Sequence, residues 1–163
     1  MKIEVRLESL ESTPAAYVHA GGDNPEEDAS AAISAWGIPR GLYDRGSSSR
    51  LFGRNTYPTD KPEPHGYEFF LTLDRPAGED PGIGIEIREI PGGLYAVLRI
   101  TGLENIGKAW TQLFEWVEAS EHQHVGWRRE DKGWVGGFEE HLNFSEALPP
   151  SEWVFDLWVR LKE

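Results

Sequence analysis

The residues best placed to do chemistry lie in two segments that alternate like β-strands. In residues 154–161, apolar side chains alternate with Asp156 and Trp158, and side chains two apart on a strand share one face of a sheet. An earlier segment repeats this alternation with Glu68 and Phe70. A face that mixes carboxylates with large aromatic rings suits a lipophilic cation, through charge and cation–π attraction.

A third strand, expected over residues 138–144, adds further polar groups. Its apolar residues Phe138 and Leu142 are expected on the helix-facing side, which predicts Glu139 and His141 on the opposite face with the other candidates. Glu139 is the expected charge partner of a cation, and in an enzyme it could act as general base on water. The complete set of candidate ligand-binding residues is Glu139, His141, Asp156, Trp158, Phe70, Glu68, Tyr95, Trp110 and Phe52.

Each candidate also has a purely structural interpretation. Glu139 and His141 could be ordinary solvated strand residues, whereas Trp158 and Phe70 could be covered by a partner chain instead of a ligand. Trp110 and Tyr95 could pack in the core, since Trp110 lies on the apolar stripe of an expected helix.

The composition excludes several classes of function. The chain has 163 residues, a formal net charge of −12 and no cysteine. Its acidity argues against binding to nucleic acid or to an anionic membrane surface, and the absence of cysteine excludes thiolate metal centres and disulfides. No cofactor or metal is expected, because His122 and His124 have no third ligand at a fitting spacing. The chain begins without a secretory leader pattern, so a cytoplasmic location is expected.

The order of the expected elements indicates a duplication. Two ββαββ units, residues 1–80 and 81–163, are expected within a single domain that covers 1–163. The sequence IEVR at 3–6 matches IEIR at 85–88 in the same element order. The predicted fold class is α+β, an antiparallel sheet with two helices on one face and a ligand cavity on the other. A long polar loop at 120–137 contains Trp127 and Trp134, which could form a lid.

The sequence resembles GyrI-like small-molecule-binding domains, which also serve as effector-binding domains of AraC- and MerR-type multidrug-sensing regulators. The resemblance covers essentially the whole chain. It implies tandem units around a central ligand cavity and an acidic ligand residue that opens a Glu-x-Tyr pattern, here Glu139 with His141 in place of the tyrosine. A protonatable histidine there would weaken the selectivity for cations. The resemblance rests on IPGGLYAV at 90–97, AWTQLFEW at 109–116, FEEHLN at 138–143 and FDL at 155–157.

The expected function is therefore that of a stand-alone protein that binds amphipathic or cationic organic molecules, because the family domain fills the chain. Two alternatives remain open. Some GyrI-like proteins resemble hydrolases of reactive cyclopropanoid toxins, in which case Glu139 would act on water. Others resemble gyrase inhibitors, in which case the acidic surface would meet a protein partner, either gyrase or a regulator.

Overall fold

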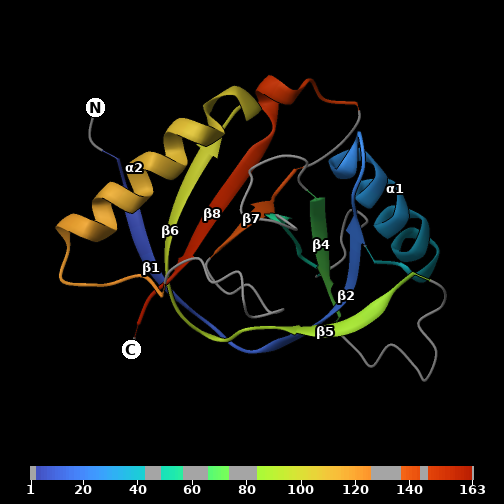
Figure 1. Cartoon of the computed structure of the whole chain (residues 1–163), viewed down its shortest axis with the longest axis horizontal. Coiled ribbons are helices and arrows are strands. Elements are labelled where there is room, and N and C mark those ends of the chain that lie inside the picture. The colour runs from blue at the N-terminus through green and yellow to red at the C-terminus, as the bar shows by residue number, and fades with distance from the viewer. Residues whose placement is uncertain are drawn as a thin grey trace. The chain divides into compact units, whose positions relative to one another are not determined.

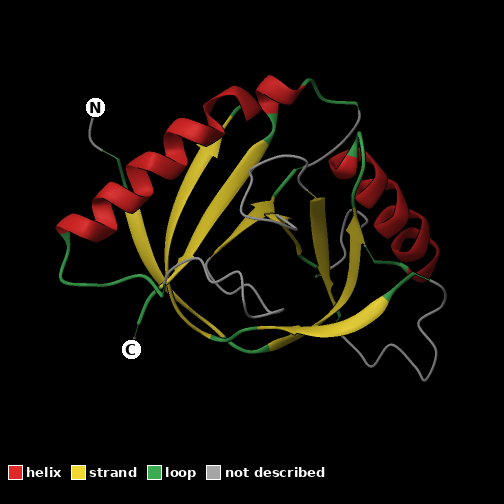
Figure 2. Cartoon of the chain, in the orientation of Figure 1, coloured by secondary structure: helices red, strands yellow, loops and turns green. Residues whose placement is uncertain are grey.

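The computed structural model describes residues 3–42, 49–56, 66–73, 84–125, 137–143 and 147–162. The chain forms two compact units. We call residues 12–90 the N-terminal unit, and residues 1–11 together with 91–163 the C-terminal unit. Each unit is an antiparallel sheet with one α-helix packed against it, so the predicted class of antiparallel sheet with two helices is confirmed (Figures 1 and 2).

The N-terminal unit has one helix, α1 (Pro25–Gly37), over four strands. Pro25 suits the first turn of a helix because its missing N–H would have no partner there. Ala29, Ile33 and Trp36 recur at helical spacing and are buried against the sheet. In sheet order the strands are β3 (Leu51–Thr56), β4 (Gly66–Thr72), β2 (Thr13–Ala20) and β5 (Glu86–Ile90).

The C-terminal unit is built in the same way around α2 (Ile106–Ala119), which runs along β6 and β8 (Figure 1). Ala109, Leu113 and Val117 form the buried stripe of this helix. Short 3₁₀ turns cover Leu103–Asn105 and Pro150–Glu152 in this unit, and Ile38–Arg40 in the N-terminal unit. In sheet order the strands are β7 (Gly137–His141), β8 (Val154–Arg160), β6 (Gly93–Thr101) and β1 (Val5–Leu10).

The two units have the same strand order, with one strand of each taken from the other end of the chain. β1 pairs with β6, and β5 pairs with β2. The compact units therefore differ from the predicted repeats, 1–80 and 81–163. The first strand of the first repeat, β1, belongs to the C-terminal unit, and the first strand of the second repeat, β5, belongs to the N-terminal unit. Because only two residues separate β1 from β2 and β5 from β6, each short connection passes directly from one unit to the other.

Both faces of each sheet carry buried side chains, not only the face under the helix. On the face away from α2, Tyr95, Phe138 and Trp158 are each at most 1% exposed. On the face away from α1, Phe52 is 1% exposed and Phe70 is 3% exposed. The alternation of side chains along each strand thus distinguishes two faces that both carry buried residues. It does not distinguish a buried face from a solvent-exposed one.

Strand β3 contains one glycine for a packing reason. The ring of Tyr67, on the neighbouring strand β4, lies where a side chain at position 53 would be. A Cβ atom at Gly53 would overlap the Tyr67 hydroxyl and lie 2.6 Å from Tyr67 Cε1. A larger residue at position 53 would force the tyrosine ring out of the core.

We expect Gly53→Ala to lower the free energy of unfolding by about 1–3 kcal/mol, although alanine is intrinsically better than glycine in a strand. Urea unfolding checks this, with Gly21→Ala as the matched control because a Cβ there meets no atom within 4 Å. In a Tyr67→Ala background the Gly53→Ala cost should largely vanish. Equal costs in both backgrounds would contradict the steric explanation.

Candidate functional site

Strand β7 places its two neighbouring glutamates on opposite faces of the sheet. Glu139 is paired with Leu157 of β8, and Glu140 is paired with Asp156. Leu157 belongs to the apolar cluster beneath α2, so Glu139 lies on the helix side and Glu140 on the other. The predicted facing of this strand was wrong by one residue, because Phe138 packs opposite Trp158 on the face away from the helix.

Glu139 is held by the helix that covers its face. The indole Nε1–H of Trp110 donates a hydrogen bond to Glu139 Oε2 at 3.1 Å. The carboxylate is 9% exposed, whereas the Trp110 ring is half-buried. Trp110 stacks on Phe114, one turn further along α2, at 5.9 Å between ring centroids. A buried carboxylate therefore lies beneath partly accessible aromatic rings.

His141 shares the helix-side face with Glu139, because the two residues are two apart on β7 and His141 is paired with Phe155. Its ring meets the Phe155 ring edge-on at 5.0 Å, and its Nδ1 atom is buried. Burial lowers the pKa of His141 to about 3. The imidazole is therefore neutral near pH 7, so it adds no positive charge that would oppose a cation.

Further aromatic side chains extend this face along α2. His124, which follows the helix, contacts Phe114 edge-on at 5.4 Å between ring centroids. Trp153 contacts Phe155 at 6.5 Å between ring centroids. We call the whole group the Glu139 cluster; it consists of Glu139, Trp110, Phe114, His124, His141, Trp153 and Phe155.

The structure thus brings together three of the predicted site residues, Glu139, His141 and Trp110. Sequence reasoning did not assign Phe114, Trp153 or His124 to the site. The four-residue spacing of Trp110 and Phe114 on a helix was an available signal for Phe114. No spacing in the sequence indicates His124, because its position follows from an isolated β-bridge to Leu161.

Asp156 takes part in a network of ion pairs on the face away from α2. Arg99 donates to its two oxygens at 2.9 and 3.0 Å, and Arg6 of β1 donates at 2.5 Å. Burial disfavours the charged carboxylate, but the hydrogen bonds from Arg99 and Arg6 outweigh it and hold the pKa of Asp156 below its usual value. The charge of Asp156 is therefore compensated within the protein.

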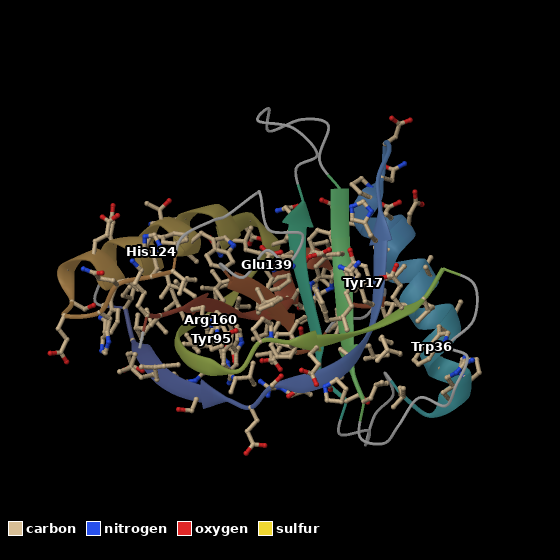
Figure 3. All side chains as sticks on the ribbon, turned by 60° about the horizontal axis from the view of Figure 1, so that its bottom comes forward. Tyr17, Trp36, Tyr95, His124, Glu139 and Arg160 are labelled. Carbon is tan, nitrogen blue, oxygen red and sulfur yellow. The ribbon has the colours of Figure 1, made fainter. Side chains whose placement is uncertain are left out.

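The two aromatic candidates on that face are packed with each other. Tyr95 meets Trp158 edge-on at 5.5 Å, and Tyr95 is paired with Arg160 on the adjacent strand (Figure 3). Trp158 Nε1–H donates to Glu140 Oε1 at 3.1 Å. Glu140, like Glu139, therefore accepts a hydrogen bond from an indole. The indole that bonds to Glu140, that of Trp158, is fully buried.

The three candidates of the N-terminal unit, Phe52, Glu68 and Phe70, lie on the face away from α1. Glu68 accepts hydrogen bonds from Arg54 Nε–H and, at 2.6 Å, from the Tyr17 hydroxyl. Burial and the bond to Glu68 raise the pKa of Tyr17. Like Asp156, Glu68 is paired with a guanidinium group in a packed layer.

An open groove of about 770 Å³ lies along β1 and β6, with Gln112 of α2 at its border. Its charged lining includes Arg6 and Arg99, which already bind Asp156. Glu4 and Glu8 also line the groove, and Glu8 pairs with Arg6.

Within the described ranges, no group of three or more histidine and acidic side chains could hold a metal ion. No helix in those ranges is long and apolar enough to cross a membrane. The predicted lid residues Trp127 and Trp134 lie outside the described residues.

The chain belongs to the family of GyrI-like small molecule binding domains, whose profile matches residues 3–162. Among solved structures, the EcmrR C-terminal domain is similar with a TM-score of 0.71 at 12% identity, over 100% of this chain and 99% of that one. A hydrolase from Listeria innocua has a TM-score of 0.64 at 11% identity, over 99% and 93%. SAV2435 bound to tetraphenylphosphonium has a TM-score of 0.58 at 12% identity, over 98% and 94%.

At these identities the likeness establishes a shared fold. No curated protein matches the sequence.

The buried imidazole predicts acid sensitivity. Because the pKa of His141 is about 3 in the folded chain and 6.5 ordinarily, only the unfolded chain gains this proton as the pH falls below 6.5. The free energy of unfolding should therefore decrease by roughly 1 kcal/mol per pH unit from this residue.

Urea unfolding from about pH 6.5 down to about pH 4.5, above the range in which Asp156 titrates, measures this slope. His141→Gln should flatten it, and His19→Gln, at an exposed position, should not. An unchanged slope in His141→Gln would show that the ring is protonated in the folded chain.

Proposed function

We propose that this protein binds amphipathic organic cations at the Glu139 cluster. Glu139 supplies the counter-charge, and the rings of Trp110 and Phe114 form the wall against which the apolar part of the ligand lies. The observation that carries the proposal is a buried carboxylate, oriented by an indole N–H, beneath half-buried aromatic rings.

The physical argument concerns the groups that hold each buried carboxylate. Asp156 and Glu68 each accept hydrogen bonds from guanidinium groups, so a cationic ligand would have to compete with an arginine. Glu139 accepts a hydrogen bond from the indole of Trp110, which orients the carboxylate and carries no charge of its own. A negative charge at a site of low water content attracts a cation more strongly than one in bulk water does.

The aromatic rings favour a particular kind of cation. The face of an indole or phenyl ring attracts positive charge, and the ring surface also covers apolar groups. A large cation with spread-out charge and apolar substituents loses less hydration on binding than a small ion does. The solved relative bound to tetraphenylphosphonium supports this class of ligand and supplies a probe.

We expect Glu139→Gln to weaken binding of tetraphenylphosphonium by about tenfold or more, equivalent to about 1.4 kcal/mol. The substitution removes the charge and keeps the shape of the side chain. Calorimetric titration measures the dissociation constant, and quenching of tryptophan fluorescence provides a second readout.

The matched control is Glu140→Gln, one residue along the same strand but on the opposite face. It should leave binding within about twofold of wild type, because its amide oxygen still accepts from Trp158. Triphenylphosphine oxide, a neutral molecule of similar rings, should not distinguish Glu139→Gln from wild type. A larger loss in Glu140→Gln than in Glu139→Gln would contradict the proposal.

Hydrolysis at the same cluster is the second candidate function. Glu139 and the neutral His141 share a face, so a carboxylate base and an imidazole lie on one side of the strand. The relatives include a hydrolase from Listeria innocua. Incubation with a cyclopropane-bearing electrophile tests this candidate: hydrolysis predicts product above the buffer control that Glu139→Gln abolishes, whereas binding alone predicts none.

A further inference from the structure

We propose that this protein forms a symmetric dimer in which strand β1 pairs antiparallel with β1 of a second copy. In this arrangement Leu7 lies opposite the Leu7 of the other copy on the two-fold axis, and Arg6 of each copy lies opposite Glu8 of the other. The inference goes beyond the proposed function, because it concerns an edge of the sheet and no residue of the Glu139 cluster.

Strand β1 is the outermost strand of its unit. It pairs with β6, and the described strands leave its other edge without a neighbour. None of its six residues is fully buried, and the side chain of Leu7 is 45% exposed. An edge strand presents a row of backbone N–H and C=O groups with which another strand can pair.

The side chains of β1 alternate between the two faces of the sheet. Leu7 is paired with Ala96, which belongs to the apolar cluster beneath α2, so Leu7 lies on the helix side. Arg6 and Glu8 flank Leu7 and lie on the other face, where Arg6 donates a hydrogen bond to Glu8. An apolar side chain on one face is therefore accompanied by one basic and one acidic side chain on the other.

This short pattern is complementary to itself when the strand is reversed. A two-fold axis perpendicular to the sheet brings two copies of β1 together in opposite directions, with the helix sides of both copies on the same side. With Leu7 on the axis, the basic residue Arg6 of one copy faces the acidic residue Glu8 of the other, and symmetry repeats this pair. Opposite charges directly across an antiparallel pair stabilise it, and the two leucine side chains cover each other's exposed surface.

The same charges select the register. If the axis moved by one residue, to Arg6 or to Glu8, two like charges would lie directly opposite each other, which destabilises a pair of strands. The axis at Leu7 is therefore favoured over both neighbouring registers. It also pairs Val5 of one copy with Ser9 of the other, so five residues of each β1 take part.

The overall charge of the protein opposes association, because each copy carries a net charge of −12. At physiological ionic strength, charges separated by more than about 8 Å are largely screened. Side chains directly opposite on paired strands start only about 4.5–5.5 Å apart. The attraction between Arg6 and Glu8 thus acts at a distance over which screening is weak.

Sedimentation velocity of the full chain at physiological ionic strength, from about 1 µM to 1 mM, covers the range expected for a small interface. We expect a monomer–dimer equilibrium. Leu7→Glu and Leu7→Lys each place two like charges on the axis, so each alone should weaken dimerisation by about tenfold or more. An equimolar mixture of the two variants should dimerise more strongly than either alone, because opposite charges then meet on the axis.

Two controls accompany these variants. Thermal unfolding should show that both are folded, since position 7 is exposed. Ile87→Lys adds a charge at an exposed residue of β5, the outermost strand of the other unit, and it should leave dimerisation unchanged. A loss of association in Ile87→Lys but not in the Leu7 variants would place the interface at β5 and overturn the inference.

The register has a separate test, because the chain contains no cysteine. Oxidation of Leu7→Cys should join two chains through one disulfide, since the two side chains face each other across the axis. Ser9→Cys, on the same face and also exposed, is the matched control. Its two copies would lie four residues apart, about 13 Å along the strand, and should not be joined.

Two results would overturn the inference while leaving the proposed function intact. One is a wild type that stays monomeric at the highest concentration. The other is a mixture of Leu7→Glu and Leu7→Lys that associates no more than the separate variants do. Conversely, a failure of tetraphenylphosphonium to bind would overturn the proposed function and leave the dimer standing.

Discussion

A carboxylate removed from water must be compensated, and this constraint organises the described part of the molecule. Four acidic side chains are buried there, Glu68, Glu139, Glu140 and Asp156. Two of them accept hydrogen bonds from arginine guanidinium groups, and the other two accept them from indole N–H groups. Guanidinium cancels the charge, whereas indole only orients it. Of these four, Glu139 is the one that lies on the face of its sheet covered by the helix.

Contacts of arginine side chains also hold β1 and β5 in their sheets. We call these two strands the exchanged strands, because each pairs within the unit formed by the other end of the chain. Arg6 comes from β1 and reaches Asp156 on β8, across the intervening strand β6. In the N-terminal unit, Arg88 of β5 lies over the Tyr17 ring at 3.8 Å, and Tyr17 in turn donates to Glu68. Each exchanged strand thus brings one arginine to the face away from the helix. In our proposal that face is structural, and the ligand binds on the helix side of the C-terminal unit at the Glu139 cluster.

The sequence predicts the helices, the strands and the faces of β4 and β8, because their apolar residues alternate or recur at helical spacing. The face of β7 could not be predicted in this way. Its two glutamates are adjacent and both sheet faces are apolar, so alternation alone cannot choose between registers that differ by one residue. The pairing of Arg6 with Asp156 spans 150 positions, and it follows from the exchange of β1, which local patterns do not reveal. Glu139, His141 and Trp110 lie on one side of the sheet, although the predicted facing of β7 was wrong by one residue.

The central claim, that a cation binds on the helix side against Glu139, can be tested at the indole that holds the carboxylate. The ¹H–¹⁵N spectrum reports each tryptophan indole N–H, and Trp110→Phe and Trp158→Phe identify two of the seven tryptophan signals. During titration with tetraphenylphosphonium, we predict that the Trp110 signal shifts with the binding curve and that the Trp158 signal, bonded to Glu140, stays in place. A shift of Trp158 with Trp110 unchanged would place the ligand on the opposite face and contradict the account.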